Sequence, residues 1–219
     1  WAKSGGVEAA KKVEAILDLL EKSKDSKVRP SLRSYSVAID AWARSGSEFA
    51  GKKAEAIFNR MLSASKKNPS LAPNSIVFGG VINAWARCGG EEAAERAEAI
   101  LKLMEKSKNP NSRANVRAYS ATIDAWAKSG SAIAGFRADA ILNRMHQRSK
   151  QGDTDATPNA VTYGSVVNAW VKSCDGGEEA VQRADDILQL MEERAAQDPT
   201  QDRPNTNMYI LVRTAWKAL

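Results

Sequence analysis

The stretch that decides the fold is YSVAIDAWARSGS at residues 35–47, which returns as YSATIDAWAKSGS at residues 119–131. Two related stretches are FGGVINAWARCGG at residues 78–90 and YGSVVNAWVKSCDGG at residues 163–177. The six tryptophans, at positions 1, 42, 85, 126, 170 and 216, are therefore 41 to 46 residues apart. Self-similarity at such a period is typical of a solenoid. Odd copies resemble odd ones and even copies even ones, so a two-repeat period overlies the short one.

Each copy is paired with a second apolar segment. These segments read VEAILDLL, AEAIFNRM, AEAILKLM, ADAILNRM and ADDILQLM, and they end at Leu20, Met61, Met104, Met145 and Met191. Alanine-rich text with apolar residues three and four positions apart predicts an amphipathic helix. Glycine-containing turns separate the two halves, and loops bearing Pro and Asn separate the repeats. The sequence therefore predicts an all-α solenoid of stacked helix-turn-helix hairpins, because neither hairpin helix can bury its apolar face alone.

The composition excludes several classes of protein. Of 219 residues, 43% are hydrophobic and 26% are charged, which is too apolar for a disordered chain, and no apolar run is long enough to span a membrane. Two cysteines, Cys88 and Cys174, cannot form a disulfide framework, and a single histidine, His146, excludes a His-based metal site. A net charge of +6 favours an anionic partner. Since the chain begins at Trp1, we expect a fragment with any targeting segment outside it.

The first helix of each hairpin has an apolar stripe. Tyr35, Ile39 and Trp42 are spaced i, i+4, i+7, so they fall within roughly 60° of one another on a helix. The same spacing recurs at Phe78, Ile82 and Trp85, at Tyr119, Ile123 and Trp126, and at Tyr163, Val167 and Trp170. We expect these rings to form the core between hairpins rather than to stack on nucleic-acid bases.

The opposite stripe of the first helix is polar and ends in a cation. It comprises Arg33, Ser36, Asp40 and Arg44; Ile76, Gly79, Asn83 and Arg87; Arg117, Ser120, Asp124 and Lys128; and Val161, Gly164, Asn168 and Lys172. With Lys3, a cation closes the stripe in five repeats. Regularly spaced cations suit a phosphate backbone, although cations in the last helical turn also favour the helix dipole.

The stretches VTYGSVVNAWVKS at 161–173, SYSVAIDAWARSG at 34–46 and AEAIFNRM at 54–61 closely resemble the two helices of pentatricopeptide repeat (PPR) proteins. The resemblance covers essentially the whole chain and is P-type-like, with repeats longer than usual for the family. It implies a right-handed superhelical solenoid. The implied organisation is a partial repeat at 1–31 (mainly a second helix), repeats at 32–74, 75–115, 116–159 and 160–205, and a partial repeat (a first helix) at 206–219.

The resemblance also implies a function, which is sequence-specific binding of single-stranded RNA with one base per repeat. Such proteins act in mitochondria or plastids, in RNA stabilisation, processing or translation, and a cytoplasmic location is the alternative. It implies no cofactor, small-molecule substrate or membrane partner; protein partners stay unknown. The base-reading pairs it implies are Ser36 with Asn74, Gly79 with Asn115, Ser120 with Asn159, and Gly164 with Asn205.

Further site residues follow from the same resemblance. Base-flanking positions correspond to Arg33, Ile76, Arg117 and Val161, of which the two arginines depart from the family pattern. Phosphate contacts are expected from Lys3, Arg44, Arg87, Lys128 and Lys172. Ser with Asn suits adenine in the family, since both side chains can donate and accept hydrogen bonds. Glycine offers no side chain, so the base preference of the two even repeats stays open.

Catalysis by this segment is not expected. Asp40 and Asp124 recur because the repeat recurs, Asp185 and Asp186 belong to an acidic solvent face, and His146 is expected to be a cation near a helix C-terminus. A catalytic domain outside the chain is an open alternative. The rival function is a protein-binding scaffold like tetratricopeptide repeats, which the even-repeat glycines favour. Recurrent asparagines at the repeat ends and cations in register favour RNA.

Overall fold

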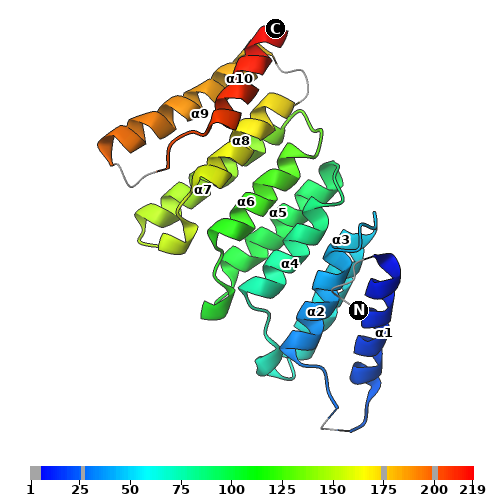
Figure 1. The fold of residues 1–219 in the computed structure, drawn as a ribbon. Helices are drawn as coiled ribbons and strands as arrows, with labels where there is room; N and C mark the ends of the chain where they lie inside the picture. The colour runs from blue at the N-terminus through cyan, green and yellow to red at the C-terminus, as the bar shows by residue number, and fades with distance from the viewer. Residues whose placement is uncertain (1–5, 26–27, 174–176, 199–201) are drawn as a thin grey trace. The chain divides into compact units, whose positions relative to one another are not determined.

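The computed structural model describes residues 6–25, 28–173, 177–198 and 202–219. Within these ranges the chain forms ten α-helices, three short 3-10 turns and no strand, which confirms the all-α prediction (Figure 1). The helices are α1 (Val7–Lys22), α2 (Leu32–Ala43), α3 (Ala50–Ser65), α4 (Ser75–Ala86), α5 (Glu91–Lys106), α6 (Val116–Ala127), α7 (Ala134–Lys150), α8 (Ala160–Lys172), α9 (Glu178–Gln197) and α10 (Thr206–Ala218).

The chain divides into two compact parts. The first comprises Trp1–Gly89 and Arg96–Arg113, and the second Gly90–Glu95 and Ala114–Leu219. In the first part, α2 packs against α1, α3 and α4. In the second part, α6 packs against α7 and α8, and α8 packs against α7, α9 and α10 (Figure 1). In both, the first helix of one hairpin contacts the first helix of the next, as stacked hairpins require.

The predicted apolar stripe is buried in α2, α4, α6 and α8. Its aromatic side chains are at most 5% exposed, and the aliphatic residue between them is fully buried in each helix. In α10 the equivalent Tyr209 is 42% exposed and Trp216 is half-buried, since among the described residues only α8 and α9 pack against this helix. Trp1 lies outside the described residues.

Glycines end the first helices where the sequence predicts turns. Gly46 and Gly130 have φ angles of 71° and 69°, a left-handed conformation that favours glycine. The loops between hairpins contain the 3-10 turns η1 (Pro69–Leu71), η2 (Pro110–Ser112) and η3 (Thr154–Ala156). The Ser112 hydroxyl donates to the carbonyl oxygen of Pro73 at 2.6 Å, which ties one such loop to the preceding one.

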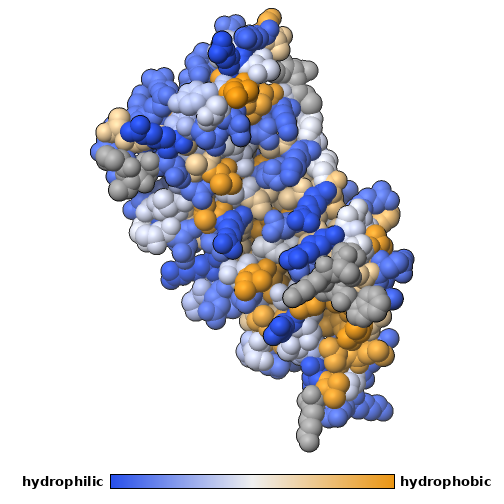
Figure 2. Space-filling model, viewed as in Figure 1, coloured by the Kyte–Doolittle hydropathy of each residue, from blue (hydrophilic) through white to orange (hydrophobic). Residues whose placement is uncertain are grey.

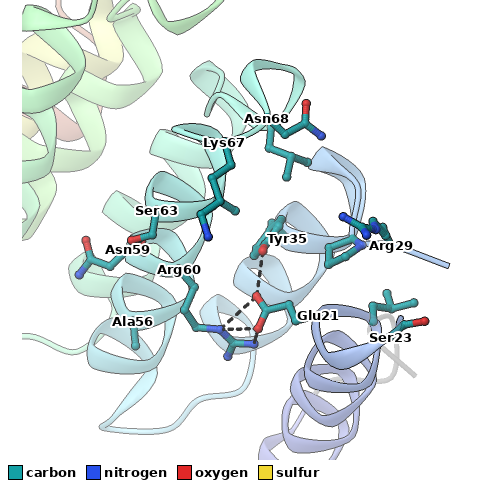
Figure 3. Close-up of a pocket in the computed structure, with 14 residues that line it drawn as sticks. Glu21, Ser23, Arg29, Tyr35, Ala56, Asn59, Arg60, Ser63, Lys67 and Asn68 are labelled. Carbon is teal, nitrogen blue, oxygen red and sulfur yellow. Dashed lines mark hydrogen bonds and ion pairs between the residues drawn. The ribbon is translucent and has the colours of Figure 1, made fainter. Parts of the chain in front are cut away.

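Polar side chains on the second helices bind the hydroxyl groups of the buried tyrosines. The Tyr35 hydroxyl in α2 donates to Glu21 in α1 at 2.8 Å, and Arg60 in α3 reaches the same carboxylate at 2.6 Å and Asp18 at 2.5 Å. Figure 3 shows Tyr35 and Arg60 converging on Glu21 from two helices. This network links three helices of the first part, because the hydroxyl of the buried Tyr35 and the charged groups of Glu21 and Arg60 each have a partner on another helix.

The expectation that His146 is a helix-terminal cation is wrong. Its ring lies half-buried in α7, and Nε2 is 3.2 Å from the hydroxyl of Tyr163 in α8. Burial, together with the positive charges of Arg194 and Lys150, lowers the pKa of His146 to about 4. Arg194 donates to the same tyrosine oxygen, so the tyrosine proton is free to bond a neutral imidazole. His146 is therefore an uncharged packing residue.

Among the helices of the described residues, none is long and apolar enough to cross a membrane. The same residues contain no group of three or more His, Cys, Asp or Glu side chains that could hold a metal ion. Cys174 lies outside the described residues, and Cys88 is a free thiol whose sulfur accepts the backbone N–H of Gly51 at 3.3 Å.

Candidate nucleic-acid interface

The asparagines expected to read bases are the N-caps of the first helices. Their Oδ1 atoms accept the backbone N–H of the third helical residue at 3.0 to 3.1 Å in α4, α6, α8 and α10. The residues are Asn74, Asn115, Asn159 and Asn205. A capping side chain is held in one orientation, and its Nδ2 group remains as a hydrogen-bond donor. Sequence reasoning missed this role, although Asn directly before an apolar-periodic helix is its usual signal.

The two serines expected to read bases have different surroundings. Ser36 in α2 is partly exposed, and its hydroxyl makes no hydrogen bond among the described residues. Ser120 in α6 is only 9% exposed, and its hydroxyl lies 2.9 Å from that of Thr162 in α8. The two odd repeats are therefore chemically distinct at this position, despite nearly identical sequence.

The two glycines at the same position also differ. A Cβ placed on Gly79 in α4 would meet no atom within 4 Å. A Cβ placed on Gly164 in α8 would lie 3.1 Å from Cε of Met208 in α10. Gly79 thus leaves open space, whereas the Met208 side chain fills part of the space beside Gly164. Gly79 lies in the first compact part and its expected partner Asn115 in the second.

The expected base-flanking residues are on the surface. Ile76 is 69% exposed and Val161 is 66% exposed, and both occupy the second position of a first helix. Arg33 and Arg117 hold the same position in α2 and α6 and are exposed as well. Exposed aliphatic side chains beside polar groups can contact the flat face of a base, and guanidinium planes can stack on one.

The cations at the ends of the first helices are exposed but partly engaged. Arg44 pairs with Asp40 at 3.0 Å and Lys128 with Asp124 at 2.6 Å, both one helical turn apart. Exposed pairs of this kind contribute about 0–1 kcal/mol, so a phosphate group can compete for the cation. Arg87 instead donates to the carbonyl oxygen of Ala43 at the end of α2, at 3.1 Å. Lys172 is exposed in the last turn of α8, and Lys3 lies outside the described residues.

A polar hollow of about 390 Å³ lies between α2 and α4 on this surface. It is lined by Asp40, Ala43, Arg44, Gly80, Asn83 and Arg87, so two guanidinium groups, an amide and a carboxylate open into one space. Gly80 keeps the helices close, since a Cβ there would lie 2.9 Å from Cγ2 of Ile39. The hollow can accept an anionic or hydrogen-bonding group between adjacent first helices.

Two of the other hollows in the first compact part lie beside α1. A cleft of about 790 Å³ between α1, α2 and α3 has the Tyr35, Glu21 and Arg60 network among its lining residues (Figure 3). An apolar groove between α1 and α2 is lined by Val13, Ile16, Leu20 and Val37, with Arg33 beside them, and Figure 2 shows apolar side chains gathered there. The network residues of the larger cleft already bind one another, and the groove is lined mainly by apolar side chains.

No protein-family model matches the sequence, and no curated protein does. Among solved structures, the chain is similar to the pentatricopeptide repeat protein PPR10 in complex with an 18-nt psaJ RNA element, and to a cysteine-substituted PPR10 in complex with the same element. Each comparison has a TM-score of 0.59 and 20% identity, and covers 96% of this chain and 26% of PPR10. The chain thus spans about a quarter of those proteins, and its fold is that of a pentatricopeptide repeat solenoid.

Proposed function

We propose that the protein binds single-stranded RNA through the surface of its first helices, with one nucleotide per repeat. The observation that carries the proposal is a recurring arrangement in α4 and α8. In each helix an exposed aliphatic residue is followed three positions later by a glycine and eight further on by a cation. The preceding asparagine caps the helix and keeps its amide donor. The likeness to PPR10, whose structure contains an RNA element, supports this reading.

The parts of a nucleotide match the parts of this surface. Single-stranded RNA is recognised through stacked base faces and through hydrogen bonds to base edges. Ile76 and Val161 suit the base face, the Asn74 and Asn159 amides suit the base edge, and the helix-terminal cations suit phosphate groups. Phosphate contacts position the RNA, and the amides with their neighbouring serines choose the base.

We further propose that the RNA is organellar, in a mitochondrion or a plastid, and that binding serves its stabilisation, processing or translation. This part rests on the resemblance to PPR proteins. Subcellular fractionation tests it, because recovery of the protein with the cytosol would favour a cytoplasmic role instead.

The test of RNA binding uses two charge-matched variants. One replaces Arg44, Arg87, Lys128 and Lys172 by Gln. The control replaces four exposed lysines that lie on or directly after second helices by Gln, so the net charge falls by the same amount. These lysines are Lys11, Lys66, Lys106 and Lys150. Fluorescence anisotropy with labelled single-stranded RNA of random sequence should show weak binding by the first variant and near-normal binding by the control. Equal weakening of both variants would indicate a general charge effect and reject the surface.

The rival function, a peptide-binding scaffold, makes the opposite prediction. A protein that binds peptides through its hollows should show no measurable affinity for single-stranded RNA, and loss of the four first-helix cations should leave its peptide affinity unchanged. Such a result would replace RNA by protein as the partner.

A further inference from the structure

In the second compact part, one side chain links the two residues expected to read a single base. Thr162 is the third residue of α8 and is fully buried. Its Oγ1 lies 2.9 Å from Oγ of Ser120 and 3.1 Å from Oδ1 of Asn159. We propose that Thr162 fixes which of these groups donates and which accepts, and so sharpens the choice between adenine and guanine in the 116–159 repeat. The inference rests on the proposed RNA-binding function.

In this arrangement the proton of Thr162 points at Asn159 Oδ1. A threonine hydroxyl has one proton and two lone pairs. It donates to Asn159 Oδ1, and it accepts the backbone N–H of Asn159 at 3.3 Å. With the Thr162 proton directed at Asn159 Oδ1, the 2.9 Å contact between the two hydroxyl oxygens takes its proton from Ser120. Ser120 keeps only its lone pairs and meets a base as an acceptor.

The side-chain amide of Asn159 is left as a donor, whereas Ser120 is left as an acceptor. Its Oδ1 accepts both the backbone N–H of Thr162, at 3.0 Å, and the Thr162 hydroxyl, which uses both lone pairs. Its Nδ2 group makes no hydrogen bond among the described residues and can only donate. Ser120 and Asn159 therefore present one acceptor and one donor in a fixed order.

A fixed order distinguishes adenine from guanine. The Watson–Crick edge of adenine carries an amino donor beside a ring-nitrogen acceptor, and that of guanine carries a carbonyl acceptor beside an N–H donor. For a given orientation of the base, the acceptor of Ser120 and the donor of Asn159 match the donor and acceptor of one purine. The other purine then places an acceptor against Ser120 and a donor against Asn159. Unpaired polar groups in such a site are costly, so the wrong purine is disfavoured.

The 32–74 repeat has no threonine hydroxyl that could link its serine to its asparagine. Val77 holds the third position of α4, is fully buried and has no hydroxyl. Asn74 Oδ1 therefore accepts only the backbone N–H of Val77, at 3.1 Å, and the Ser36 hydroxyl keeps both its proton and its lone pairs. Because a free hydroxyl can rotate to donate or accept, Ser36 should tolerate both purines.

The experiment exchanges the third-position residues. The proteins with Thr162→Val and Val77→Thr are incubated with short single-stranded RNAs of random sequence, and the bound RNAs are sequenced. Thr162→Val should lower the ratio of the preferred purine to the other roughly tenfold at one nucleotide. Val77→Thr should raise the corresponding ratio at a nucleotide two positions away, since one repeat separates the two sites. The resemblance to the PPR family makes adenine the expected preference.

Thr162→Ser is the matched control, because it keeps the hydroxyl and should keep the wild-type ratio. Thermal melting confirms that each variant is folded. Unchanged purine ratios in folded, RNA-binding Thr162→Val and Val77→Thr proteins would overturn the inference alone. Failure of the unmodified protein to bind any RNA would overturn the proposed function and the inference with it.

Discussion

The indole N–H of Trp85 in α4 donates a 2.9 Å hydrogen bond to Glu55 in α3, whose other carboxylate oxygen binds Arg96 at 3.0 Å. Trp170 and Asp139 hold the equivalent positions in the second compact part. There, Asp139 binds Arg183 at 2.8 Å, but its Oδ1 and the Trp170 indole nitrogen are buried without hydrogen-bond partners among the described residues. Aspartate is one methylene shorter than glutamate, so it satisfies the arginine alone.

Asp139→Glu should therefore stabilise the protein. The longer side chain can reach Trp170 while still binding Arg183, which satisfies two buried polar atoms. A net gain of about 1 kcal/mol is expected for one such hydrogen bond. Urea denaturation measures the free energy of unfolding. The reciprocal Glu55→Asp should lose a similar amount, and a gain in both variants would contradict this explanation.

Substitution by alanine should be tolerated at Gly79 but not at Gly51 or Gly135. A Cβ on Gly51 or Gly135 would lie 2.4 Å from the ring of Trp85 or Trp170, while one on Gly79 meets nothing within 4 Å. Gly51→Ala and Gly135→Ala should each cost about 1–3 kcal/mol, because the indole has no room to move in a packed core.

Gly79→Ala is the control for these variants. Alanine is favoured over glycine inside a helix by about 1 kcal/mol, so this change should be neutral or stabilising. Thermal melting of the three variants checks the order. Destabilisation by Gly79→Ala as large as that by Gly51→Ala would show that the space beside Gly79 is filled.

Much of the fold could be predicted from the sequence, because stacking requires the same apolar stripe to be buried in every repeat. The spacing of Tyr35, Ile39 and Trp42 sufficed to predict the buried stripe, and the glycines predicted the hairpin turns. Contacts between repeats could not be predicted in this way. Whether Trp170 finds a carboxylate depends on one methylene in another hairpin, and the Ser120–Thr162 bond depends on the register of α6 against α8.

The site was predicted residue by residue only through the family resemblance, and its roles stay predictions. The sequence did not reveal that the asparagines cap helices, nor that Arg87 binds a carbonyl oxygen of α2. The neutral state of His146 was also missed, since it arises from burial and from Arg194 in a later helix.

The capping and reading roles of Asn74 should be separable. Asn74→Asp keeps an oxygen that can accept the Val77 N–H, so stability should stay within about 0.5 kcal/mol of wild type. It removes the Nδ2 donor, so the base preferred at that nucleotide should change. Asn74→Ala removes the cap and should cost about 1 kcal/mol. Denaturation and sequencing of bound RNA measure the two effects, and an Asp variant with unchanged base preference would show that the amide does not read the base.

The free energy of unfolding should decrease as the pH falls, over a pH range set by the pKa values of His146 in the unfolded and folded states. The folded-state pKa of His146 is lowered to about 4 from the ordinary 6.5, so the unfolded chain takes up a proton first. The stabilisation is complete above about pH 6.5 and is lost as the pH falls towards 4. His146→Asn should flatten this part of the profile. An identical pH dependence of unfolding in the two proteins would contradict a buried neutral histidine.

The salt dependence of RNA affinity tests the central claim most directly. If the cations Arg44, Arg87, Lys128 and Lys172 each meet a phosphate of a single strand, the logarithm of the association constant should fall with the logarithm of salt concentration with a slope of about −3. Replacing one of them by Gln should reduce that slope by about 0.7. A slope near zero, or one that the four substitutions leave unchanged, would contradict RNA binding by the first-helix surface.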